Sequence, residues 1–169
     1  MILSTQSSTR IEDVAEARGA PIWHQLYSTD RWGNTVLMLQ RAEAAGATAV
    51  CLTIDLPGRR NTETQSRLFR EDDRNCLDCH RGQAKPMFEG LDMRGARLTD
   101  PSLTWDVIGR MKQVTDMNVI IKGIEVAEDA ALAVEYGADG IIVSNHGGRA
   151  VETGRGTIEC LPEVVAAVS

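Results

Sequence analysis

The chain has 169 residues, of which 43% are hydrophobic and only five are proline, a composition typical of a globular protein with an ordinary apolar core. Its formal net charge of −6 disfavours general nucleic-acid binding, which requires a basic face. No apolar run is long enough to cross a bilayer, and residues 1–4 lack the basic start of a signal peptide. We therefore expect a single cytoplasmic domain over residues 1–169 with no transmembrane segment.

Residues 1–54 alternate apolar, β-branched segments with amphipathic ones, the pattern of strands and helices in turn. Thr9 and Glu12 fit a capping box, in which a hydroxyl and a carboxylate satisfy free backbone amides at a helix start, and Gly19 fits a left-handed helix end. Asp30 or Asn34 would open the next helix. We expect strands over residues 1–4, 21–27 and 47–54 and helices over residues 9–18 and 30–46.

The regular pattern disappears over residues 56–100, which are polar and rich in Arg, Asp and Gly. Loops of this length are uncommon in compact domains and tend to be functional or mobile, so we expect a long loop excursion with no more than one short helix. Pro162 suits the first turn of a final helix, where its missing N–H costs nothing. Beyond the excursion we expect helices over residues 101–115, 126–137 and 161–168 and strands over residues 118–122 and 140–144.

Strands and helices alternate about five times, which predicts a parallel sheet with right-handed crossovers. Candidate functional residues follow four of the strands at their C-terminal ends. A (β/α)8 barrel builds its active site at that rim from several strands, whereas an open doubly wound sheet concentrates its site at one reversal point. Because a whole barrel usually takes about 250 residues, we predict an α/β fold that forms part of a TIM barrel. The candidate residues are Gln25, Tyr27, Thr53, Asp55, Lys122, His146 and Arg149.

The most informative of these strand ends is residues 140–149. A β-branched strand stops at Ser144, and two adjacent glycines in the following turn allow backbone conformations that are closed to other residues. His146 and Arg149 could place a base and a planar anion-binding group near one point. The residues of this stretch alone leave a catalytic His–Arg pair and a solvated loop as equal alternatives.

Residues 76–80, within the long excursion, read Cys-Leu-Asp-Cys-His and match C-x-x-C-H. This is the pattern of covalent c-type haem attachment, with Met87 as the nearest candidate axial ligand, but such attachment requires a periplasmic location and no signal sequence is visible. A zinc site would need a fourth ligand, for which His24 and His146 are the remaining histidines. We favour a structural or redox-sensitive pair formed by Cys76 and Cys79, and we assign no metal.

Taken together, the motifs resemble the FMN-dependent 2-hydroxy acid oxidase and dehydrogenase family, which includes glycolate oxidase, lactate oxidase and dehydrogenase, and mandelate dehydrogenase. The signature is Ser-Asn-His-Gly-Gly-Arg at residues 144–149. The resemblance covers almost the whole chain, with order and approximate spacing preserved. Its other parts are Leu-Ser-Thr at 3–5, Gln-Leu-Tyr at 25–27, Thr-Ile-Asp at 53–55, Ile-Lys-Gly at 121–123, Glu-Asp-Ala at 128–130 and Leu-Pro-Glu-Val-Val at 161–165.

The resemblance implies a partial TIM barrel that oxidises a 2-hydroxy acid to the 2-oxo acid with FMN as cofactor. His146 would be the base that takes a proton from the substrate, and Asp55 would stabilise the resulting imidazolium. Tyr27 would hydrogen-bond the substrate hydroxyl. Arg149 and Arg60 would clamp the substrate carboxylate, because a planar two-pronged donor suits its two oxygens.

The resemblance also implies four residues that hold the flavin. Lys122 would lie near the N1 and O2 edge, where reduction leaves negative charge, and Ser4, Gln25 and Thr53 would hydrogen-bond the isoalloxazine ring. Simpler interpretations exist, such as a helix or turn cap for Asp55 and a surface lysine for Lys122. The joint occurrence of these residues at four strand ends favours the functional interpretation.

The sequence also departs from the family pattern. The link between Asp55 and the pair Arg59 and Arg60 is compressed, so either arginine could face the substrate, and we favour Arg60. Gln6 stands where several members place an aromatic residue, which indicates a more polar substrate pocket. The family's first barrel strand and its last two strands, whose glycine-rich loops grip the FMN phosphate, have no counterpart, and we expect a fragment of the barrel.

Three hypotheses follow. The leading one is an FMN-dependent oxidoreductase of a small 2-hydroxy acid, of unspecified side chain and electron acceptor, acting as a homo-oligomer or with the remainder of the barrel. The second is a truncated, cofactor-free barrel fragment without independent catalysis. The third, a relative of inosine monophosphate dehydrogenase, is disfavoured because no cysteine stands in a glycine-rich loop.

Overall fold

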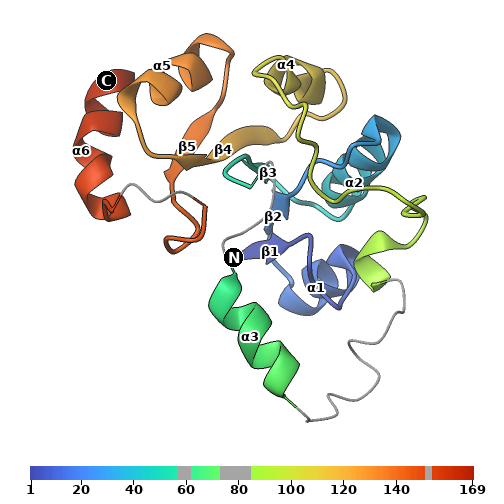
Figure 1. The fold of residues 1–169 in the computed structure, drawn as a ribbon. Coiled ribbons are helices and arrows are strands. Elements are labelled where there is room, and N and C mark those ends of the chain that lie inside the picture. The colour runs from blue at the N-terminus through green and yellow to red at the C-terminus, as the bar shows by residue number, and fades with distance from the viewer. Residues whose placement is uncertain (57–61, 73–84, 151–153) are drawn as a thin grey trace.

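The computed structural model describes residues 1–56, 62–72, 85–150 and 154–169 (Figure 1). One sheet of five parallel strands, in the order β1-β2-β3-β4-β5, forms its centre. Strand order follows chain order, so each crossover advances the chain by one strand in the same direction, as in a barrel of β/α units. The expected α/β fold with a parallel sheet is confirmed. The strands are β1 (Ile2–Ser4), β2 (Trp23–Leu26), β3 (Ala49–Thr53), β4 (Asn118–Ile124) and β5 (Gly140–Val143).

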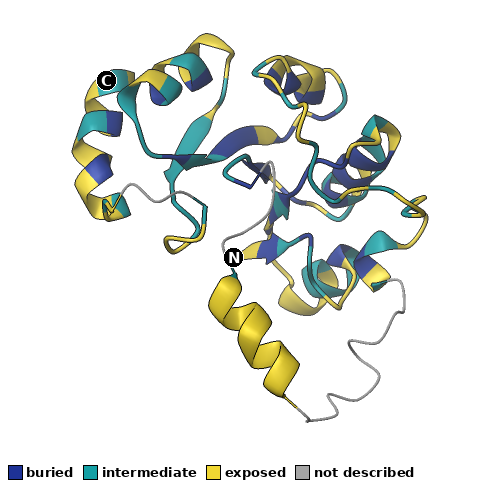
Figure 2. Ribbon diagram, viewed as in Figure 1, coloured by how far each residue is buried: buried dark blue, intermediate teal, exposed yellow. Residues whose placement is uncertain are grey.

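The helices form an arc around one side of this sheet, except for α3, which stands apart from it (Figure 1). No side chain of α3 is buried, whereas the others turn an apolar face to the strands (Figure 2). The sheet and the arc together form the two packed layers expected of β/α units. The helices are α1 (Ile11–Arg18), α2 (Trp32–Ala44), α3 (Glu63–Glu71), α4 (Val107–Lys112), α5 (Ala127–Glu135) and α6 (Thr157–Val168), with the 3-10 helix η2 (Pro86–Phe88).

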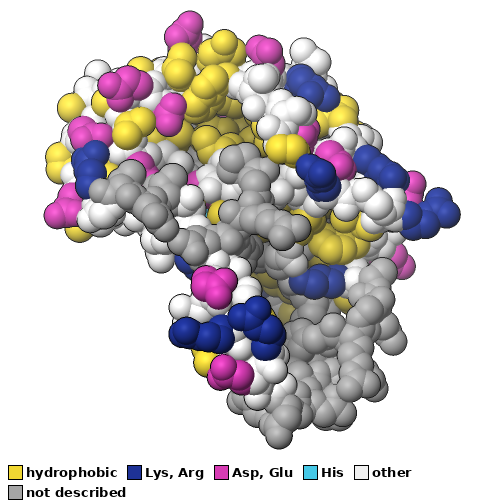
Figure 3. Space-filling model, viewed as in Figure 1, with side chains coloured by type: hydrophobic (Ala, Val, Ile, Leu, Met, Phe, Trp, Pro, Cys, Tyr) yellow, Lys and Arg dark blue, Asp and Glu magenta, His cyan; other side chains and the backbone are white. Residues whose placement is uncertain are grey.

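The main core lies between the sheet and the helix arc. Alternate strand residues point into it, and Leu26, Leu52 and Ile121 are completely buried there. The opposite face of the sheet, which would line the interior of a closed barrel, carries a smaller apolar cluster centred on Cys51 and Ile120. In the space-filling view, further hydrophobic side chains gather between α4 and α5 (Figure 3).

Several expected helix starts are wrong. Neither Asp30 nor Asn34 opens the second helix: α2 begins at Trp32 after Arg31 without a side-chain cap, and the Asp30 carboxylate accepts the Arg97 amide instead. The capping box of Thr9 and Glu12 does not form: α1 begins at Ile11 without a side-chain cap. The Glu12 carboxylate instead accepts hydrogen bonds of 2.8 and 2.9 Å from Arg41 of α2, a long-range partner that the local motif does not reveal. The last helix begins at Thr157, because Glu159 accepts a 2.6 Å bond from the Gly156 amide, so Pro162 lies inside α6 and not in its first turn.

The helix expected over residues 101–115 is much shorter, because α4 covers only Val107–Lys112. The Asp100 carboxylate accepts bonds of 2.9 and 2.6 Å from the Ser102 amide and hydroxyl, and these bonds hold the preceding residues in a turn. The long excursion contains both α3 and η2 within its described parts, so it holds more regular structure than expected. Residues 76–80, the site of the cysteine motif, lie outside the described residues.

Candidate active site

The strand ends bring a histidine, a carboxylate and a phenol together. Nδ1 of His146, after β5, lies 2.8 Å from Oδ1 of Asp55, after β3. Nε2 of His146 lies 3.2 Å from the hydroxyl of Tyr27, after β2. An ionised carboxylate only accepts hydrogen bonds, so Asp55 holds the tautomer with the proton on Nδ1 and leaves Nε2 as an acceptor. This arrangement gives His146 the geometry of a general base.

Backbone geometry positions the His146 ring. His146 has a φ of 58°, the one positive φ of a non-glycine residue in the described ranges, and Gly147 and Gly148 continue the left-handed conformation. A left-handed histidine costs on the order of 1 kcal/mol, so the surrounding contacts have to enforce it. The Ser144 hydroxyl accepts the His146 amide at 3.2 Å, and the Asn145 side chain accepts the Gly148 amide at 3.0 Å.

Lys122, in β4, joins the same cluster. Its ammonium donates a 2.9 Å hydrogen bond to the Ser144 hydroxyl and lies 3.8 Å from Oδ2 of Asp55. The Asp55 side chain is only 4% exposed, so this carboxylate is buried between a lysine on one side and His146 on the other. The Lys122 charge and the hydrogen bond from His146 both stabilise the negative charge of this buried carboxylate.

Ser4, Gln25 and Thr53 form a hydrogen-bonded row across β1, β2 and β3. The Ser4 hydroxyl donates to Oε1 of Gln25 at 3.0 Å, and Nε2 of Gln25 donates to the Thr53 hydroxyl at 2.8 Å. The strand registers place these residues and Lys122 on the sheet face opposite the main core. Hydroxyl, amide and ammonium groups in one row fit the carbonyl and nitrogen edge of an isoalloxazine ring.

Of the two arginines expected to bind the substrate carboxylate, Arg149 and Arg60, only Arg149 lies within the described residues. Arg149 is exposed, and its Nε donates a 2.7 Å bond to the carbonyl oxygen of His146, which leaves the terminal nitrogens of the guanidinium for other partners. It also lines a hollow with the first turns of α3, including Leu68. Arg60 lies outside the described residues. Arg149 is therefore held beside His146, and the carboxylate clamp formed by both arginines stays a prediction.

Two residues with positioning roles were not singled out from the sequence. Ser144 connects Lys122 to the His146 amide, and Gly123 lies directly against Asp55. Both stand inside motifs that the sequence did indicate, residues 144–149 and 121–123. Their roles depend on contacts between strands, which a linear motif does not show.

His24 and Met87, which were considered as metal or haem ligands, lie away from the cluster around His146. His24 and Met87 are 1% and 2% exposed and line the same small pocket between the sheet, α1 and α2. Cys51 and Cys160 are buried free thiols, and burial raises the pKa of Cys51 to about 11. Within the described ranges, no group of three or more His, Cys, Asp or Glu side chains could hold a metal.

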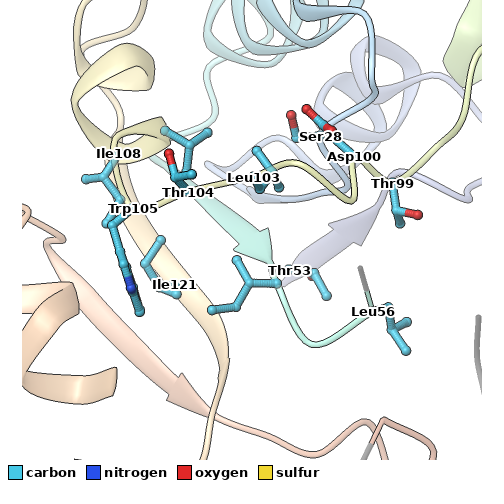
Figure 4. A pocket seen from close by; sticks show the side chains of 12 residues that line it. Ser28, Thr53, Leu56, Thr99, Asp100, Leu103, Thr104, Trp105, Ile108 and Ile121 are labelled. Carbon is cyan, nitrogen blue, oxygen red and sulfur yellow. The ribbon is translucent and has the colours of Figure 1, made fainter. Parts of the chain in front are cut away.

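A separate cavity of about 230 Å³ lies behind the rim (Figure 4). Ser28, Asp100 and Thr104 give it a polar side, and Leu103, Trp105 and Ile108 line the rest. It shares Thr53 with the hydrogen-bonded row of Ser4, Gln25 and Thr53 but includes neither Tyr27 nor His146. The reactive groups therefore lie on the open rim and not in this cavity.

The family model described as FMN-dependent dehydrogenase matches residues 1–169, the entire chain. The chain belongs to the FMN-dependent dehydrogenase family. A similar curated protein is the 2-hydroxyacid oxidase of Dictyostelium discoideum, 39% identical over an alignment of 176 positions that covers 97% of this chain and 43% of that protein. The L-lactate oxidase of Nostoc sp. is 36% identical over 180 residues, covering 100% of this chain and 49% of that protein.

Solved structures of the family show the same fold. Mandelate oxidase with (S)-2-phenylpropionate is 34% identical, with a TM-score of 0.77 over 99% of this chain and 45% of that one. A flavocytochrome b2 variant is 29% identical, with a TM-score of 0.78 over 99% of this chain and 38% of that one. The chain thus spans about half or less of these family members, and its five-stranded sheet is a part of their TIM barrel. Within the described ranges, no helix is long and apolar enough to cross a membrane.

Proposed function

We propose that this chain carries the substrate-oxidising residues of an FMN-dependent 2-hydroxy acid oxidoreductase. The observation that supports this most directly is the contact between Asp55, His146 and Tyr27, 2.8 and 3.2 Å on the two sides of one imidazole. A base with one nitrogen fixed by a carboxylate and the other facing a phenol suits deprotonation of a hydroxyl group.

The proposed reaction uses each residue at a defined atom. Nε2 of His146 takes the proton of the substrate's 2-hydroxyl group, and Asp55 stabilises the imidazolium that forms. Tyr27 hydrogen-bonds the same hydroxyl and orients it toward Nε2. Arg149 and Arg60 hold the carboxylate. FMN, when bound, accepts the hydrogen on C2 with its electron pair, so that the substrate leaves as a 2-oxo acid.

The cofactor contacts in this proposal come from Lys122 and from the row of Ser4, Gln25 and Thr53, which we call the flavin-facing row. Ser4, Gln25 and Thr53 would exchange part of their mutual hydrogen bonds for bonds to the ring edge. Lys122, held by Ser144 and Asp55, would place its positive charge where the reduced ring becomes negative. A rigid cation adds more to this stabilisation than a mobile one, because no reorganisation is required.

The alternative is a cofactor-free barrel fragment without independent catalysis. The chain spans 43% to 49% of the two curated relatives, and this alternative stays a prediction. The cytoplasmic location and the assembly, as a homo-oligomer or with the remainder of a barrel, stay predictions.

A visible absorption spectrum separates the two functions. The purified chain is mixed with FMN, separated from free FMN by gel filtration, and then given L-lactate, glycolate or L-malate without oxygen. Flavin bands that co-elute and then bleach support the oxidoreductase. A protein that retains FMN without bleaching with any of the three acids contradicts it, and a colourless protein supports the cofactor-free fragment.

A further inference from the structure

Gln6 lies in the turn after β1, between the flavin-facing row and Tyr27. Its backbone amide donates a 3.0 Å hydrogen bond to the Ser4 hydroxyl, and that hydroxyl donates to the Gln25 side chain. The adjacent Thr5 hydroxyl accepts the Tyr27 amide at 3.2 Å. The turn is therefore attached both to the flavin-facing row and to the backbone of Tyr27, the residue whose phenol lies beside His146. A substrate at His146 would meet this turn on its flank.

Lys85 places a positive charge on the turn. Its ammonium donates hydrogen bonds of 3.0 Å to the Gln6 carbonyl oxygen and 2.5 Å to Oε1 of the same residue. Both acceptors are neutral, so they orient the charge without neutralising it. An ammonium has three N–H donors, and one remains for another acceptor.

The other lysines of the chain behave differently. Lys112 forms an ion pair with Asp139 at 2.7 Å, and Lys122 lies 3.8 Å from Asp55. Among the described residues, no carboxylate forms an ion pair with Lys85. In a chain of net charge −6 with 24 acidic residues, this half-buried cation therefore lacks the ion pair that the other lysines have.

We propose that Gln6 and Lys85 form the subsite for the substrate side chain and that they select a 2-hydroxy acid bearing a second carboxylate. The remaining N–H of Lys85 would donate to that distal carboxylate, and the NH2 group of the Gln6 side chain would add a neutral donor. The arginine side of the site would hold the first carboxylate. A charge-assisted hydrogen bond in a partly buried site is stronger than a neutral one, so a diacid gains affinity over an apolar acid of the same shape. This inference rests on the proposed function for the position of the 2-hydroxy acid.

A pair of matched ligands tests the subsite. L-malate and L-2-hydroxy-4-methylpentanoate have the same branching and a similar length, because two methyl groups of the second stand in place of the distal carboxylate oxygens of the first. Binding of each to the isotope-labelled chain is followed by NMR, through the side-chain amide of Gln6 and the backbone amide of Tyr27. Lys85→Gln removes the charge at the subsite, and Lys112→Gln removes a charge that is paired with Asp139 as the control.

We expect L-malate to bind at least about tenfold more tightly than the apolar acid. Lys85→Gln should reduce that ratio to about one, and Lys112→Gln should leave it unchanged. Equal affinities in the unaltered chain, no malate binding at millimolar concentration, or a ratio that survives Lys85→Gln would each overturn the proposal and leave Lys85 as a support for the turn.

The outcome is distinguishable from that of the proposed function. Bleaching of bound FMN by L-lactate together with no preference for malate would retain the oxidoreductase and reject the subsite. A Lys85-dependent preference for malate, with no bleaching of bound FMN by L-lactate or L-malate, would support the subsite and reject the reaction.

Discussion

The α-carbon of Gly123 in β4 lies directly against the side chain of Asp55. A β-carbon at this position would lie 2.6 Å from Cβ, 2.8 Å from Cγ and 2.9 Å from the backbone nitrogen of Asp55. Gly123 also has a φ of +116°, which side chains rarely allow. The absence of a side chain therefore lets β4 approach closely enough to help hold Asp55 at 2.8 Å from His146.

Replacing Gly123 with Ala should destabilise the fold by roughly 2–4 kcal/mol, because steric overlap and backbone strain add. Urea denaturation measures the free energy of unfolding. Gly109→Ala in α4 is the matched control, since a β-carbon there meets nothing within 4 Å and should be neutral or stabilising by about 0.5 kcal/mol. Equal effects of the two substitutions would contradict this role of Gly123.

Replacing His146 with Ala should lower the rate of flavin reduction by substrate on the order of 10³-fold or more, since the base is lost. FMN affinity should change little, because the flavin-facing row of Ser4, Gln25 and Thr53 stays intact. Stopped-flow absorbance gives the reduction rate, and fluorescence quenching gives the affinity. Loss of FMN binding without a specific loss of reduction would reject the base assignment.

Replacing Arg149 with Lys should weaken substrate binding by at least about tenfold, because an ammonium cannot make the two-pronged contact with a carboxylate. The bond from Nε of Arg149 to the His146 carbonyl is also lost, so the turn loses one support. The substrate dependence of the reduction rate gives the apparent affinity. An unchanged value would exclude Arg149 from the carboxylate clamp, and Arg94→Lys, at an exposed ion pair with Asp92, serves as the control.

His24 should make the fold sensitive to acid. Its pKa is lowered from 6.5 to about 4, mainly by burial and also by nearby Arg41, and the Leu3 backbone offsets only part of the effect. Neither ring nitrogen has a hydrogen-bond partner among the described residues. Below pH 6.5 the unfolded chain binds more protons than the folded one, so stability is lost as pH falls from 6.5 toward 4, by at most about 3 kcal/mol.

Urea denaturation at pH 7 and at pH 4.5 tests this pH dependence in the unaltered chain and in His24→Leu. Carboxylates also titrate near the lower pH, so the difference between the two proteins isolates the histidine. His24→Leu should lose less stability on acidification than the unaltered chain. The same acid sensitivity in both would show that His24 does not cause it.

Local sequence patterns predict the strands of this protein and their parallel arrangement in one sheet. The strands were found within a few residues because β-branched segments of their length form strands wherever they are packed, and the alternation with helices required parallel pairing. Parallel strands bring their C-terminal ends to one edge. Residues as distant in sequence as Tyr27, Asp55 and His146 could therefore be assigned to one site before any contact was known.

Tertiary structure decided the contacts themselves. Glu12 bonds Arg41 and not the start of its own helix, and Lys122 is held by Ser144 and Asp55. Whether Gly123 touches Asp55 and whether Lys85 reaches Gln6 depend on how strands and loops distant in sequence pack. The sequence by itself determined which chemical groups stand at the rim, because strand pattern and residue type are local. Only the packing of the chain decided which of those groups meet, because a polar group takes the best partner within reach in space, whatever its distance along the chain.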